Sequence, residues 1–105
     1  MPNFSDSCNV KNCDKKFNEE EIIRAIRFNI AAEYEATQLY QQIAAATDNA
    51  FVKKVVLEIA DEERVHAGEL LMLLTHLCPN EAKLYEKGAQ EVEEIIAEID
   101  KKGDK

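Results

Sequence analysis

In two long segments of this chain, largely apolar residues recur at alternating steps of three and four. This periodicity constrains the fold more than any other feature of the sequence. Residues at that spacing line one side of an α-helix and form the seam along which helices pack. No segment shows the strict alternation typical of a strand, so we predict an all-α chain. The first seam contains Ile23, Ile26, Ile30, Glu33, Thr37, Tyr40 and Ala44, and the second contains Val52, Val56, Ile59, Glu63, His66, Leu70, Leu73 and Leu77.

Capping and termination signals divide the chain into three helices. Asn18 precedes three consecutive glutamates, which is a capping side chain followed by acids at the positive end of a helix dipole. Pro79 ends the second helix, because proline cannot continue the backbone hydrogen bonding. We expect two long antiparallel helices and a shorter, amphipathic third one. Their predicted spans are about residues 19–46, 49–77 and 80–100.

The length of the chain limits its organisation. With 105 residues it makes one domain. We predict a flexible leader over residues 1–18, a helical domain over residues 19–100 and a solvated tail over residues 101–105. A chain this short buries a limited share of its surface, so we expect its stability to depend on oligomerisation.

The charge balance excludes some classes of partner. Asp and Glu total 21 against 13 Lys and Arg, which gives a net charge of −8. Nucleic-acid phosphates require a basic surface, so we expect no nucleic-acid partner, whereas an acidic surface attracts cations.

No run of about 18 apolar residues is present, so we expect no membrane span. The first residues lack the pattern of a secretory signal, which favours a cytoplasmic location.

The chain has three cysteines. An odd count, in a chain without the pattern of a signal peptide, predicts no disulfide framework. Cys8 and Cys13 fall in the leader, where free thiols, a redox pair or a shared metal are alternatives. Cys78 precedes Pro79 at a helix end and is expected to act as a small apolar filler.

Residues 63–66 read Glu-Arg-Val-His, and this Glu-x-x-His motif lies in the middle of the second predicted helix. Side chains three residues apart on a helix point the same way. A carboxylate and an imidazole are good ligands for iron, manganese or zinc. A polar pair on an apolar seam needs a partner that offsets the cost of burial, and a metal is one such partner.

A third polar residue falls at the same height in the predicted hairpin. Glu33 lies fifteen residues before Asp48 in the turn, and Glu63 lies fifteen residues after it. At the helical rise per residue, each is roughly 22 Å from the turn. Glu33, Glu63 and His66 are therefore expected to converge on one point between the two helices.

This set is half of a known arrangement. Carboxylate-bridged di-iron bundles use four helices, of which two supply a Glu each and two supply Glu-x-x-His. The chain supplies one of each. A two-fold dimer would duplicate every ligand, so we predict that two hairpins form a four-helix bundle with the site across the axis.

Other residues have competing interpretations. Glu63 could instead form an ion pair with Arg64 on a solvated face. Glu62 is the rival ligand, because it lies four residues before His66. Glu69 falls off the seam and is expected to face solvent. Tyr40 has two alternatives, a place near the site or a role as core filler. Tyr34 is expected at an interface, and His76 is expected near a helix end.

Residues 33–40 (Glu-Tyr-Glu-Ala-Thr-Gln-Leu-Tyr) and 61–67 (Asp-Glu-Glu-Arg-Val-His-Ala) resemble the encapsulated ferritins. These are short members of the ferritin-like superfamily, related to rubrerythrins, and the resemblance covers about residues 19–100. It implies a ferroxidase, in which dimers form the di-iron centre and five dimers form a ring-like decamer. It also implies housing in an encapsulin nanocompartment, built by a shell protein, that stores the oxidised iron.

The resemblance also implies roles for single residues. Glu33, Glu63 and His66 would be the iron ligands, with Mn, Zn or Ca as possible substitutes for iron. Tyr40 matches a tyrosine near the centre, and Glu35 matches a carboxylate on the path by which iron enters. Two positions depart from the family pattern: Ala32 stands where a second carboxylate of that path is found, and Leu39 replaces a tryptophan.

Two further functions stay open at this point. A rubrerythrin-like peroxidase would turn over faster with peroxide than with dioxygen. A non-catalytic helical interaction module would use its buried polar residues to set pairing register and would bind no stoichiometric iron.

Overall fold

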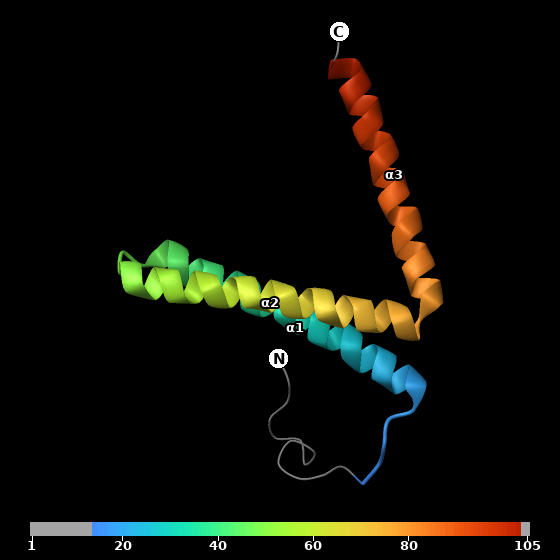
Figure 1. Cartoon of the computed structure of the whole chain (residues 1–105), viewed down its shortest axis with the longest axis horizontal. Helices are drawn as coiled ribbons and strands as arrows, with labels where there is room; N and C mark the ends of the chain where they lie inside the picture. Colours follow the sequence, from blue (N-terminus) through green and yellow to red (C-terminus); the bar gives the residue numbers. More distant parts are fainter. Residues whose placement is uncertain (1–13, 104–105) are drawn as a thin grey trace.

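The computed structural model describes residues 14–103, and these residues form three helices. Helices α1 (Glu19–Ala46) and α2 (Ala50–Leu77) lie antiparallel, side by side, and α3 (Pro79–Gly103) leads away from them (Figure 1). No strand is present in this part of the chain, so the all-α prediction is confirmed. Residues 14–18 precede α1 without regular helix or strand structure, while residues 1–13, with Cys8 and Cys13, lie outside the described residues.

The helix ends agree with the predicted signals, except at the end of α3. This helix continues through Gly103, so residues 101–103 belong to it and not to a solvated tail. The two lysines of this last turn suit the negative end of the helix dipole, which explains why the helix can extend over them. Pro79 is the first residue of α3, a position that needs no backbone N–H donor.

Asparagine caps fix the beginnings of both hairpin helices. The Glu21 backbone N–H donates to Asn18 Oδ1 at 2.8 Å, and the Asn18 N–H donates to Glu21 Oε1 at 2.9 Å. This reciprocal pair is a capping box. At the turn, Asn49 Oδ1 accepts from the Val52 N–H at 3.1 Å. The two caps set where each helix starts, and hence the relative height of residues on α1 and α2.

The predicted seam of α1 is confirmed, whereas that of α2 is partly wrong. Ile26, Ile30, Thr37 and Ala44 are the buried residues of α1. In α2 the buried residues are Ala60, Ala67 and Leu74, while His66 and Leu73 are exposed. The spacing of the large apolar side chains of α2 predicted its seam, but Ala60 and Ala67 occupy the seam together with Leu74. Small alanines allow the two helix backbones to approach closely. His66 consequently lies on one flank of the hairpin.

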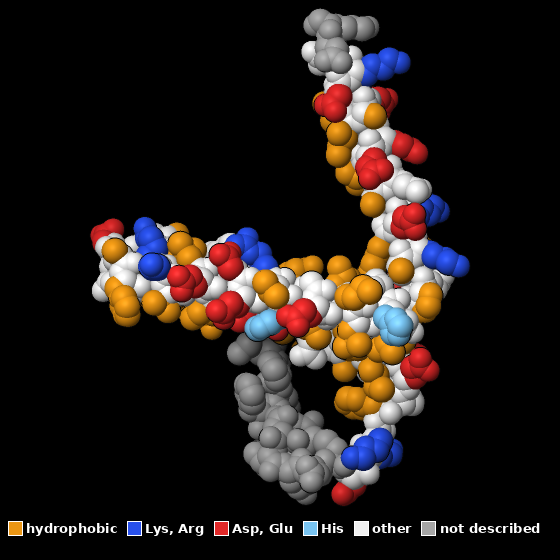
Figure 2. All heavy atoms as spheres, viewed as in Figure 1, with side chains coloured by type: hydrophobic (Ala, Val, Ile, Leu, Met, Phe, Trp, Pro, Cys, Tyr) orange, Lys and Arg blue, Asp and Glu red, His pale blue; other side chains and the backbone are white. Residues whose placement is uncertain are grey.

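A single chain leaves much apolar surface uncovered. Its radius of gyration is 19.1 Å, whereas a compact domain of 100 residues has about 13 Å. Figure 2 shows hydrophobic side chains exposed on the hairpin and along α3. The exposed residues of α3 include Val92, Ile95 and Ile99. Contiguous apolar surface of this kind is typical of an interaction site. None of the three helices combines the length and apolarity needed to cross a membrane.

Candidate metal centre

Glu33, Glu63 and His66 converge at mid-height of the hairpin. One ligand atom from each lies within 4.8 Å of the others. His66 Nδ1 is 3.6 Å from Glu33 Oε2 and 3.8 Å from Glu63 Oε2. The structure therefore contains the convergence that the equal distances from the turn predict. That these side chains bind a metal stays a prediction.

The helix interface determines how each side chain is presented. Glu33 follows Ile30 by one turn, and its backbone carbonyl accepts a hydrogen bond from Thr37 Oγ1 at 2.9 Å. Glu63 lies between the buried Ala60 and Ala67, so its backbone is held close to α1. Both carboxylates are about four-fifths buried, whereas the His66 side chain is half exposed. The site is thus open on one flank.

The electrostatics of the pair of carboxylates favour a bound cation. Hydrogen bonding to the Glu63 carboxyl raises the pKa of Glu33; burial and the Glu63 charge add to this, and His66 opposes it. Glu33 Oε2 is buried and has no hydrogen-bond partner among the described residues. A cation would satisfy that oxygen and offset the repulsion. Two carboxylates and an imidazole match the ligands that iron, manganese and zinc accept.

A hollow of about 300 Å³ opens beside these residues. Asn29 and Glu69 line it together with Glu33, His66 and Leu70. Glu69 was predicted to face solvent, and its side chain is exposed. Glu69 also borders the hollow, which the sequence did not lead us to expect. The missed signal is spacing, since Glu69 is three residues after His66 and Asn29 four residues before Glu33.

Similarity to known proteins identifies the family and the fold of the chain. The sequence profile of the family described as Rubrerythrin matches residues 25–102. This chain belongs to the rubrerythrin family. Over 88% of its length it also superposes on the crystal structure of the encapsulated ferritin domain from Pyrococcus furiosus, with a TM-score of 0.79 and 35% identity, covering 94% of that chain. The resemblance to the encapsulated ferritins is confirmed.

Two curated proteins are also similar in sequence. A ferritin-like–encapsulin shell fusion protein from Pyrococcus furiosus is 37% identical over 84 residues, which are 80% of this chain and 24% of that protein. The encapsulin nanocompartment cargo protein EncC from Myxococcus xanthus is 40% identical over 68 residues, which are 65% of this chain and 52% of that protein. The chain thus spans about a quarter and about half of these relatives.

The other candidate residues named in the sequence analysis do not belong to the cluster of three possible ligands. Tyr40 and Leu39 line a separate, mainly apolar hollow of about 510 Å³ on α1. Glu35 is exposed, and so is Glu62, which does not join the cluster of possible ligands. His76 is exposed in the last turn of α2.

Proposed function

We propose that this chain is a ferroxidase, an iron:oxygen oxidoreductase that converts Fe(II) to Fe(III) for iron storage and detoxification. The convergence of Glu33, Glu63 and His66, with an unpartnered carboxylate oxygen, carries this proposal. Membership of the rubrerythrin family supports it.

A dimer is the proposed active unit, because the described residues of one chain place three candidate ligand side chains together, on an open flank. Exposed apolar residues share that flank, because residues seven apart on a helix lie on the same side. Ala36 lies seven residues after Asn29, which borders the triad, and Ile43 lines a second hollow together with Ala36. Leu73 lies seven residues after His66, and both Ile43 and Leu73 are exposed. Burying this flank against its two-fold copy would cover the apolar residues and bring two triads together. We extend the proposal to a decamer of five dimers.

The residues of the triad have distinct roles in this proposal. Fe(II) is the substrate, and each ion gives up one electron to a dioxygen or peroxide oxidant. The anionic oxygens of Glu33 and Glu63 favour the more highly charged ferric product. Hydrogen bonding to Glu63 and burial raise the pKa of Glu33, and a bound cation, which favours the ionised carboxylate, should lower it. His66 adds a neutral nitrogen ligand from the open flank.

The proposed location is the interior of an encapsulin nanocompartment in the cytoplasm. Two similar proteins, a shell fusion protein and a nanocompartment cargo protein, support this by their names. Co-expression with an encapsulin shell protein, followed by shell purification, tests it. The chain should be retained within intact shells, and a chain found only outside them would contradict the location without bearing on the chemistry.

Iron oxidation by purified protein tests the ferroxidase proposal. Anaerobic metal-free protein receives Fe(II) and then dioxygen, and Fe(III) formation is followed by absorbance. Glu63→Gln and His66→Ala should each slow oxidation at least about tenfold, in line with the loss of a metal ligand. Glu58→Gln and His76→Ala make the same chemical changes at exposed positions of α2 and should keep the parent rate. Equal rates in all four variants would refute the proposal.

A rubrerythrin-like peroxidase is the alternative that the family match itself favours. The same assay with hydrogen peroxide in place of dioxygen separates the two. Faster turnover with peroxide, lost in His66→Ala, would establish the alternative. A helical interaction module without metal would bind no stoichiometric iron in either case.

A further inference from the structure

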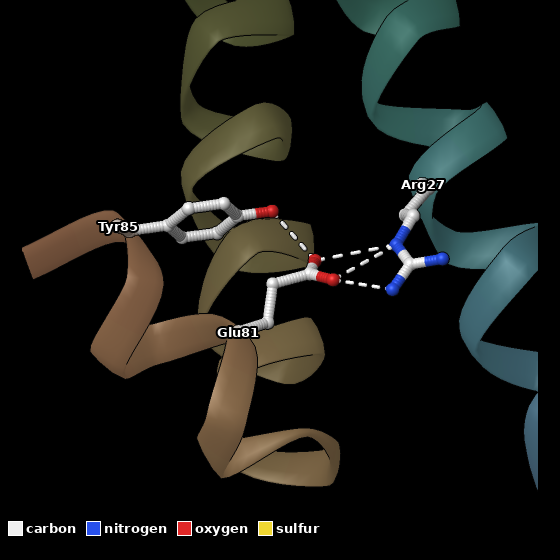
Figure 3. Close-up of polar contacts among 3 residues, drawn as sticks. All are labelled: Arg27, Glu81 and Tyr85. Atoms are coloured by element: carbon white, nitrogen blue, oxygen red, sulfur yellow. Dashed lines mark hydrogen bonds and ion pairs between the residues drawn. The ribbon is translucent and has the colours of Figure 1, made fainter. Parts of the chain in front are cut away.

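Three side chains that are not part of the Glu33–Glu63–His66 cluster join α3 to α1. Arg27 Nε donates to both oxygens of Glu81, at 3.0 Å and 3.3 Å, and Arg27 Nη2 donates to Glu81 Oε1. The Tyr85 hydroxyl donates to Glu81 Oε2 at 2.5 Å. Figure 3 shows the Glu81 carboxylate held between the guanidinium of α1 and the phenol of its own helix.

Glu81 is the buried residue in this cluster, and its burial is unusual for a carboxylate. Within the described chain it is the one buried residue of α3, with 9% of its surface exposed. A buried carboxylate is tolerated only where donors satisfy it, and both of its oxygens are satisfied here. An ion pair with a buried member is weak evidence for stability, because the cost of desolvation can match the attraction, so a role in fixing geometry is the alternative.

The remainder of α3 offers little else to fix its direction. Every residue from Lys83 to Gly103 is exposed. A helix of 25 residues is about 37 Å long, so a tilt of about 10° at its base moves its far end by about 6 Å. Small changes at Glu81 are therefore amplified along the helix.

We propose that Arg27, Glu81 and Tyr85 form a positioning clasp that sets the direction in which α3 leaves the hairpin. The clasp holds α3 in one orientation, so the exposed apolar residues Val92, Ile95 and Ile99 are presented in a single geometry. The carboxylate is the central element, because it contacts both other members. This inference does not depend on the ferroxidase proposal, since none of the three residues belongs to the metal centre.

Distance measurements between the hairpin and the far end of α3 test the clasp. Spin labels are introduced through an unnatural amino acid at the exposed positions Glu58 of α2 and Glu98 of α3. The labelled full-length chain is mixed with excess unlabelled chain carrying the same clasp residues, so that only distances within one chain contribute. The parent should give one narrow distance distribution by double electron–electron resonance.

Conservative variants distinguish the clasp from general packing. Glu81→Gln and Tyr85→Phe should each broaden the distribution about twofold or more, whereas Glu86→Gln, at an exposed position of the same helix, should leave it unchanged. The exchange variant Arg27→Glu combined with Glu81→Arg should restore a narrower distribution than Glu81→Gln. Parent-like distributions for Glu81→Gln and Tyr85→Phe, with helix content retained by circular dichroism, would overturn the proposal. Tyr85→Phe decides the question even if Glu81→Gln fails to fold.

Discussion

His66 Nδ1 lies 3.6 Å from Glu33 Oε2, across the interface between α1 and α2. The same oxygen is buried and has no hydrogen-bond partner among the described residues, and Glu63 stands close to it. A pair of carboxylates in this position costs stability while no cation is bound. We therefore expect the proposed metal centre to lower the stability of the metal-free fold, as is common where function requires a strained or repulsive arrangement.

Glu33→Gln should stabilise the metal-free protein. The pKa of Glu33 is raised in the fold by hydrogen bonding to Glu63 and by burial, so its ionised form opposes folding at pH 7. Removing the charge should increase the free energy of unfolding by about 0.5 kcal/mol or more, which raises Tm by about 2 °C or more. Thermal unfolding in the presence of a chelator measures this.

The higher unfolding free energy expected for Glu33→Gln should depend on pH. The difference from the parent should disappear below about pH 4, where the parent's Glu33 is itself protonated. Glu35→Gln removes the same charge from an exposed position nearby and should change Tm little. A metal-free Glu33→Gln protein that melts below the parent at pH 7 would show that the carboxylate pair is not a source of strain.

Ala60→Leu should destabilise the hairpin. Ala60 is completely buried between α1 and α2, so a larger side chain must push the helices apart. The expected cost is about 1–3 kcal/mol of unfolding free energy, measured by urea unfolding. The exposed Ala45 provides the control, since Ala45→Leu adds the same atoms without entering the interface. Equal stability of the two variants would contradict the alanine seam.

The sequence allowed the helices and the triad to be predicted because both depend on local spacing. Asn18 and Pro79 mark boundaries through their own backbone chemistry, and equal distances from the turn bring Glu33 and Glu63 level. The seam of α2 was misassigned because hydrophobicity ranks Leu73 above alanine, although close helix approach favours Ala67. Periodicity locates a helix face only to within about one residue.

The clasp could not have been predicted in the same way. Arg27 and Glu81 are 54 residues apart, and their contact depends on the angle between α3 and the hairpin. No periodic pattern encodes that angle, and a lone arginine on a helix is ordinarily a solvated residue. Burial of Glu81 becomes meaningful only when the tertiary structure places both donors around it.

The clasp should lose its contribution to stability in acid. Arg27 and Tyr85 donate to Glu81 and lower its pKa, so the stabilisation is complete above the ordinary glutamate pKa of about 4.3 and is lost as the pH falls through the lowered value. Urea midpoints of the parent and Glu81→Gln should therefore differ at pH 7, and the difference should be smaller at pH 3.

The comparison of these two proteins isolates Glu81, because every other carboxylate titrates in both. Glu86→Gln should match the parent at both pH values, since Glu86 is exposed. A difference between parent and Glu81→Gln that is as large at pH 3 as at pH 7 would exclude an ionised clasp. Tyr85, whose pKa is raised by its hydrogen bond to Glu81, should remain neutral at both values.

Ile43→Glu should abolish iron oxidation without unfolding the chain, if the active site forms between two copies. Ile43 is exposed on the flank proposed to meet the partner, so a charge there costs little in one chain but would be buried in the dimer. Leu57 is similarly exposed, and its helical spacing places it on the opposite flank of α2 from His66. Leu57→Glu should therefore keep the dimer and its activity. Native mass spectrometry and the oxidation assay on the same samples decide this, and a monomeric Ile43→Glu protein with the parent rate would place the whole reaction within one chain.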